Sequence, residues 1–190
     1  MDTAAVPVPE GTEPGVAFSS IVIPVREAET IVRRRALQVW PGLIPRDDGV
    51  IAHITLLAPF YPPEKIDDAV IRHLEEFFAD VTPFGFALTG VSQFPHGVTY
   101  LSPEPASTFR LLTQELHHMF PDFPPYGGAF DDVVPHLTVP LPDGEDAEAL
   151  RTALHRRLPL DAHATEATLV HVEEGDTHVI ATLPFGISAA

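Results

Sequence analysis

Two short segments of this chain repeat one pair of side chains, a histidine followed two positions later by a threonine. His53 and Thr55 lie in Ala-His-Ile-Thr-Leu-Leu, and His136 and Thr138 lie in Pro-His-Leu-Thr-Val. Imidazole titrates near neutral pH, so two histidines can serve as base and acid in one reaction. Threonine hydroxyls are neutral donors that could hold the oxygens of an anion. The pattern therefore predicts acid–base catalysis on an anionic group.

Each motif must lie on a strand for its two polar groups to act together. Side chains at positions i and i+2 of a strand share a face, and the residue between them points to the other face. His53 with Thr55, and His136 with Thr138, would then project together, above buried aliphatic residues. Rows of β-branched and apolar residues predict these strands over about 50–58 and 133–141.

The elements around the two motifs follow the same order twice: strand, helix, loop, histidine strand, helix, strand. The two histidines are 83 positions apart, which suggests an internal duplication. We expect a disordered tail at 1–16 and a single bilobal domain at 17–190, with pseudo-repeats of about 17–94 and 97–185. A pseudo-two-fold pairing of the lobes would place the histidine strands on opposite walls of a cleft. The other predicted elements are strands at 17–25, 84–94, 98–101, 165–172 and 178–184, and helices at 27–40, 63–78, 109–120 and 146–158.

Composition narrows the classes of partner. The 190 residues include 11 Lys and Arg against 27 Asp and Glu, a formal net charge of −16, which disfavours extended contacts with a nucleic-acid backbone. Cysteine is absent, so thiolate metal sites and cysteine nucleophiles are excluded. No run approaches the roughly 18 apolar residues of a membrane span. We therefore expect a soluble, cytoplasmic protein that binds neither DNA nor membrane.

The motifs His-Ile-Thr-Leu at 53–56 and His-Leu-Thr-Val at 136–139 resemble those of the two-histidine phosphoesterase superfamily. This superfamily includes the bacterial 2′-5′ RNA ligases and cyclic nucleotide phosphodiesterases, and the resemblance covers about residues 17–185. It implies an α/β (α+β) bilobal fold, with two mostly antiparallel sheets flanked by helices and a central cleft.

The resemblance also implies a metal-independent hydrolysis of a 2′,3′-cyclic phosphate or a 2′-5′ phosphodiester. By position, His53 and His136 match the family's catalytic histidines, and Thr55 and Thr138 match its phosphate-binding residues. One histidine would deprotonate water while the other protonates the departing ribose oxygen. The expected substrate is a small nucleotide or RNA terminus, and we expect a monomer with no metal and no cofactor.

Other interpretations stay open at this point. The same chemistry in reverse would form a 2′-5′ RNA link, but basic residues do not follow the two motifs as they do in many RNA-joining members. The cleft could also bind a nucleotide or phosphorylated metabolite without turnover, or the substrate could be a different phosphodiester. Tyr126 and Phe130, in the loop before the second motif, could stack on a base or simply pack against the lobe. A metal site made by His117-His118 and Asp131-Asp132 has little support, because adjacent helical residues point about 100° apart.

Overall fold

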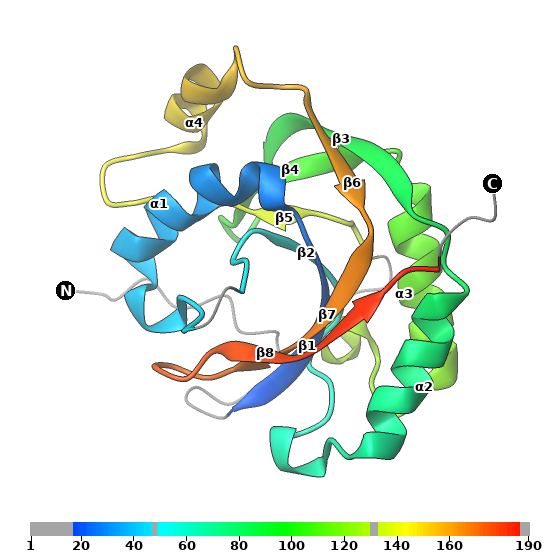
Figure 1. Cartoon of the computed structure of the whole chain (residues 1–190). Helices are drawn as coiled ribbons and strands as arrows, with labels where there is room; N and C mark the ends of the chain where they lie inside the picture. The colour runs from blue at the N-terminus through cyan, green and yellow to red at the C-terminus, as the bar shows by residue number, and fades with distance from the viewer. Residues whose placement is uncertain (1–16, 47–48, 130–132, 187–190) are drawn as a thin grey trace.

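The computed structural model describes residues 17–46, 49–129 and 133–186. The predicted tail at 1–16, Phe130 and Asp131-Asp132 lie outside the described residues. The described chain folds into one curled antiparallel sheet of eight strands with four α-helices (Figure 1). The predicted α+β class, with antiparallel strands and flanking helices, is confirmed.

The strand order is β6-β3-β4-β5-β2-β1-β7-β8, with the two histidine strands adjacent at its centre. The two predicted sheets are therefore joined through β5 and β2, and the two histidines belong to neighbouring strands rather than to opposite walls. Each half of the sheet contains strands from both predicted repeats. Strand β3 of the first repeat lies beside β4 of the second, and the β7–β8 hairpin of the second repeat lies beside β1 of the first. The strands are β1 (Phe18–Pro24), β2 (His53–Leu57), β3 (Phe84–Gln93), β4 (Thr99–Glu104), β5 (Leu137–Thr138), β6 (Leu160–Ala164), β7 (Glu166–Val172) and β8 (His178–Pro184).

The helices lie in two pairs, with α1 near α4 and α2 beside α3 (Figure 1). Helix α2 packs on β8, α3 on β2 and α4 on β3. Asp67 and Asp146 cap α2 and α4 by accepting hydrogen bonds from the first backbone amides. The helices are α1 (Glu29–Val39), α2 (Asp68–Ala79), α3 (Ser107–Met119) and α4 (Ala147–Leu154). None of these helices is long and apolar enough to cross a bilayer in the part of the chain that the structure describes.

The predicted elements agree with the structure in type and differ at their ends. Strand β6 was not predicted, and β5 has only two residues, because Pro135 and Pro140 bracket a short extended segment. The helix expected from Pro63 begins instead with a 3₁₀ turn, Pro63–Lys65, and α2 starts at Asp68. As a result α2 and α4 start 79 residues apart, and the spacing of 83 does not hold at these helices.

Candidate active site

The four predicted site residues lie on one face of β2 and β5. Ile54 pairs with Leu137 across these antiparallel strands, so His53 is in register with Thr138, and Thr55 with His136. Directly opposed residues on one face have Cβ atoms about 5 Å apart. The two histidines are then diagonal neighbours, and so are the two threonines.

Burial alternates along both motifs as the strand geometry predicts. His53, Thr55, His136 and Thr138 are partly exposed, while Ile54, Leu56, Leu137 and Val139 are at most 1% exposed. The buried set belongs to the hydrophobic core. A rigid apolar layer therefore supports each polar group, and this layer limits how far the imidazoles can shift.

Both imidazoles are held in the same way by their own strands. The Nδ1 atom of His53 lies 2.8 Å from the carbonyl oxygen of Ile51, and that of His136 lies 2.7 Å from the carbonyl oxygen of Val134. A carbonyl oxygen can only accept, so each Nδ1 carries the proton and donates. Neutral imidazole then has its lone pair on Nε2, and no hydrogen-bond partner occupies either Nε2 within residues 17–46, 49–129 and 133–186.

The two histidines differ in the neighbouring groups that change their pKa values. Burial lowers the pKa of His53, the bond to the Ile51 carbonyl raises it, His136 lowers it, and the Glu29 carboxylate raises it. Burial likewise lowers the pKa of His136, the bond to Val134 raises it, and His96 lowers it. The effect of His136 on the pKa of His53 is consistent with their diagonal positions on the paired strands.

Glu29 reaches the first motif through the backbone. Its Oε2 accepts a hydrogen bond of 2.9 Å from the amide of Ala52, the residue before His53, and its Oε1 accepts one from Arg33 Nε. Arg33 in turn donates to the carbonyl of Gly49 at 2.8 Å. Helix α1 is thus hydrogen-bonded to the segment just before β2, and Glu29 places a negative charge close to His53.

Aromatic side chains surround the second motif. Phe94 and Tyr100 meet the His136 ring edge to face, with centroids 5.0 and 5.5 Å away, and Tyr126 stacks on it at 6.1 Å. His96 stacks on Phe94 at 5.3 Å. Burial raises the pKa of Tyr126 above its ordinary value. Tyr126 has a positive φ of 52°, an unusual conformation for a non-glycine residue that often marks a functional loop.

Sequence reasoning did not find Glu29 or His96. Glu29 lies 24 positions before His53, and the hydrogen bond from the Ala52 amide to its carboxylate brings it close to the first motif. His96 follows Phe94 and Pro95 in a turn, outside the two motifs. A usable signal was the Phe-Pro-His-Gly turn directly before β4, the strand that pairs with β5.

The chain matches known proteins along most of its length. A family model described as the 2′-5′ RNA ligase superfamily matches residues 28–176. A Bacillus licheniformis protein with a provisional name as a phosphoesterase is 33% identical over 105 residues, 53% of this chain. That match spans 59% of the relative's length, which is less than two thirds.

Solved structures agree in fold. TT0787 of Thermus thermophilus is 18% identical with a TM-score of 0.53, covering 89% of this chain and 97% of that one. LigT of E. coli complexed with 3′-AMP is 17% identical with a TM-score of 0.51, covering 92% and 99%. Identities this low show the fold alone, whereas the family model covers well over half of the sequence. The protein therefore belongs to the 2′-5′ RNA ligase superfamily, the two-histidine phosphoesterases.

Proposed function

We propose that this protein is a phosphodiesterase that opens a 2′,3′-cyclic phosphate, or cleaves a 2′-5′ phosphodiester, in a small nucleotide or RNA end. The observation that carries the proposal is the matched pair of histidines on one face of the sheet. Each donates through Nδ1 to its own backbone and leaves Nε2 for proton transfer. Acid–base catalysis requires this arrangement, since one imidazole must accept a proton while another gives one.

The proposed hydrolysis of a cyclic phosphate uses each group once. One imidazole accepts a proton from water through Nε2, the water oxygen bonds to phosphorus, and the bond from phosphorus to the 3′ oxygen breaks. The other imidazole, protonated at the start, gives its Nε2 proton to that oxygen, which leaves a 3′-hydroxyl and a 2′-phosphate. Thr55 and Thr138 would donate hydrogen bonds to the non-bridging oxygens, whose charge increases in the transition state.

The surroundings of the site favour a small substrate. Phe94, Tyr100 and Tyr126 form an aromatic cluster around His136, and aromatic rings beside a reaction centre are suited to stacking with a nucleobase. The net charge of −16 repels a long polyanion. The LigT structure with 3′-AMP supports a nucleotide-sized ligand for a protein of this fold. The proposed reaction draws on side chains alone, and we expect it to be insensitive to chelators.

Turnover of 2′,3′-cyclic AMP, measured for the wild type and for His53→Ala and His136→Ala, tests the proposal. Each substitution should lower kcat/KM by about 10²–10⁴-fold, the usual contribution of a general acid or base. The double variant should lose much less than the product of the two effects, because the histidines act as a unit. His73→Ala is the matched control, since His73 is exposed on α2.

Two alternatives lead to different results in the same assay. Binding of cyclic AMP without product would indicate a non-catalytic nucleotide-binding module. The family model's name favours ligation, in which a 5′-hydroxyl takes the place of water: its oxygen bonds to phosphorus as the bond to the 3′ oxygen breaks. Joining of RNA ends with no hydrolysis of small cyclic phosphates would support the ligase. Hydrolysis that survives both histidine substitutions would refute the proposed active site.

A further inference from the structure

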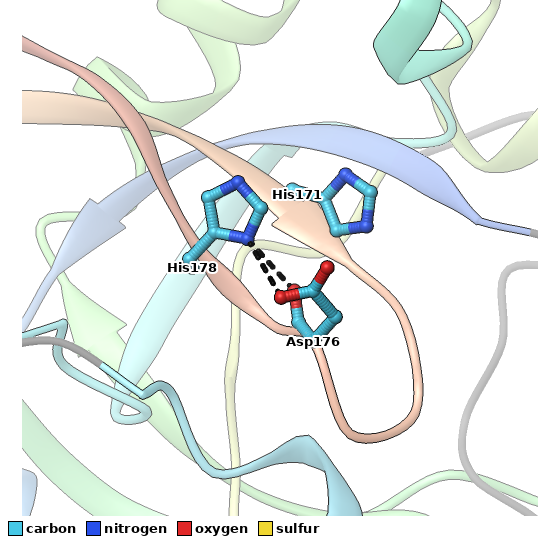
Figure 2. A group of neighbouring side chains, drawn as sticks. All are labelled: His171, Asp176 and His178. Carbon is cyan, nitrogen blue, oxygen red and sulfur yellow. Dashed lines mark hydrogen bonds and ion pairs between the residues drawn. The ribbon is translucent and has the colours of Figure 1, made fainter.

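A second group of chemically active side chains lies at the end of the β7–β8 hairpin. His171 and His178 face each other as a cross-strand pair, with ring centroids 4.7 Å apart and planes inclined by 16°. Asp176, in the turn between them, lies beneath the two rings (Figure 2). One ligand atom from each of the three residues lies within 4.8 Å of the other two, and all three side chains are partly buried.

The three ligand atoms are somewhat further apart than around a bound transition-metal ion, and small side-chain rotations close the difference. In a tetrahedral zinc site the metal–nitrogen and metal–oxygen distances are about 2.0–2.2 Å, so neighbouring ligand atoms are roughly 3.3 Å apart. The three atoms need to approach by about 1.5 Å at most, which rotations of χ1 and χ2 within staggered wells can provide. Two imidazoles with one carboxylate form a ligand set that suits Zn²⁺ and its neighbours, and it leaves a fourth position for water or another carboxylate.

The hydrogen bonds of both imidazoles fix the orientation of the rings. His171 Nε2 lies 2.9 Å from Glu173 Oε2, and His178 Nδ1 lies 2.8 Å from the carbonyl oxygen of Asp176. His178 Nδ1 is also 3.5 Å from Asp176 Oδ1 and faces that carboxylate (Figure 2). This nitrogen is therefore the ligand atom of His178, and a bound ion would replace its contact with the Asp176 carbonyl.

Backbone hydrogen bonds fix the turn that carries the ligands. The amide of Asp176 donates to the carbonyl of Glu173 at 3.1 Å, and the hydroxyl of Thr177 donates to the same carbonyl at 3.0 Å. The amide of Gly175 donates to the carbonyl of Gly42 at 2.7 Å, and that of Arg46 donates to Thr177 at 3.1 Å. The hairpin is therefore hydrogen-bonded to the segment after α1, and the ligand residues lose little conformational entropy when they bind an ion.

Local charge is compatible with a cation. Glu173, Glu174 and Asp176 place three acids in one turn, opposed by Arg46, whose Nη1 lies 3.1 Å from Asp176 Oδ1. The Arg46 and Asp176 side chains are 65% and 45% exposed, and exposed ion pairs contribute little. Arg46 can therefore turn to solvent when Asp176 binds a metal ion.

We propose that His171, Asp176 and His178 form a binding site for a divalent transition-metal ion of the zinc class. The site is separate from the two catalytic motifs. His171 pairs with Ser19 of β1, whereas His53 pairs with Pro24, five residues further along that strand or roughly 17 Å. A bound ion would link two strands at the sheet edge to the hairpin turn and stabilise the fold.

The test is a calorimetric titration of the chelator-treated, dialysed full chain with Zn²⁺ alone, near pH 7.5. The wild type should bind one ion, and His171→Ala or His178→Ala should weaken the affinity at least tenfold. His73→Ala, an exposed histidine on α2, should bind as the wild type does. Zn²⁺ should also raise the Tm of the wild type and leave the Tm of His178→Ala unchanged, because only binding to the native state stabilises it.

Conservative variants keep the result interpretable if an alanine variant does not fold. In His178→Asn the side-chain amide takes the place of Nδ1 and can still donate to the Asp176 carbonyl, and Asp176→Asn removes the charge at nearly constant shape. Both should fold and both should bind Zn²⁺ at least tenfold more weakly. Absence of saturable Zn²⁺ binding by the wild type overturns the proposal. So does binding that the hairpin variants retain and His53→Ala loses, which would place the ion at the catalytic motifs.

Discussion

The charges near the two histidines allow their roles to be identified experimentally. A negative Glu29 makes His53 easier to protonate, and a proton on His96 makes His136 harder to protonate. Removing either neighbour should therefore move one apparent pKa of the pH profile, and the two changes should have opposite signs. Glu29→Gln should lower the pKa of His53, and His96→Gln should raise the pKa of His136.

The size of the Glu29 effect can be worked out from its position. Its carboxylate touches the amide next to His53, which puts it ~8 Å from the imidazole, given 3.8 Å between consecutive Cα atoms. Two unit charges at that distance interact by about 2 kcal/mol at an effective dielectric constant of 20. The ion pair with Arg33 neutralises part of this charge, so the interaction should be weaker than this and keep its sign: Glu29→Gln lowers the pKa of His53.

The assay is kcat/KM for 2′,3′-cyclic AMP against pH, which should be bell-shaped for one neutral and one protonated imidazole. If Glu29→Gln moves mainly the acid limb to lower pH, His53 is the base. If it moves mainly the alkaline limb to lower pH, His53 is the acid. Because burial lowers the pKa of both histidines, the wild-type optimum should lie on the acid side of pH 6.5.

Matched variants separate this effect from a loss of structure. Gln at position 29 can still accept the Ala52 amide, so the fold should be retained. Glu148→Gln removes a carboxylate that pairs with Arg151 on α4, away from both histidines, and should leave both limbs unchanged. The electrostatic reasoning is wrong if Glu29→Gln and His96→Gln displace the same limb in the same direction, or if neither limb moves.

Three further outcomes test the site and its support. Thr138→Val should lower kcat/KM by about 10–10³-fold with little change in KM, because the Thr138 hydroxyl is proposed to act mainly in the transition state. A fall in affinity for the product nucleotide as large as the fall in kcat/KM would contradict this. Gly186→Ala should lower the free energy of unfolding by more than about 1 kcal/mol, because a Cβ there would lie 2.0 Å from the carbonyl oxygen of Ala79. Urea unfolding measures this, with Gly90→Ala as the control, since a Cβ at position 90 meets nothing within 4 Å and should be tolerated. Arg35→Ala should lower the free energy of unfolding by about 1–3 kcal/mol. Arg35 donates two hydrogen bonds, of 2.7 and 3.1 Å, to the Glu145 carboxylate, and both side chains are at least three quarters buried. An unchanged Tm would show that the pair contributes nothing to stability.

The sequence predicted the local features of the site and few of its long-range ones. Alternation along each motif correctly placed His53 and His136 on the face opposite the buried aliphatic residues, because a period of two is a local property. The pairing of Ile54 with Leu137 was not predictable from periodicity, since nothing in either strand specifies its distant partner. For the same reason, two separate sheets were expected where one continuous sheet is found. Glu29 and His96 were missed because their effects depend on the packing of α1 and on the turn before β4.

The pairing of β2 with β5, where the two half-sheets meet, explains how two short motifs bring four polar side chains together. Strands β2 and β5 meet through the pair Ile54 and Leu137, which are fully buried and therefore fixed in register. In an antiparallel ladder that single pairing sets both neighbouring pairs, His53 with Thr138 and Thr55 with His136. A slip of one residue would turn one motif toward the core and separate the two imidazoles. The aliphatic residues within the motifs are thus as necessary to the proposed chemistry as the polar ones, since they determine which four groups share the surface.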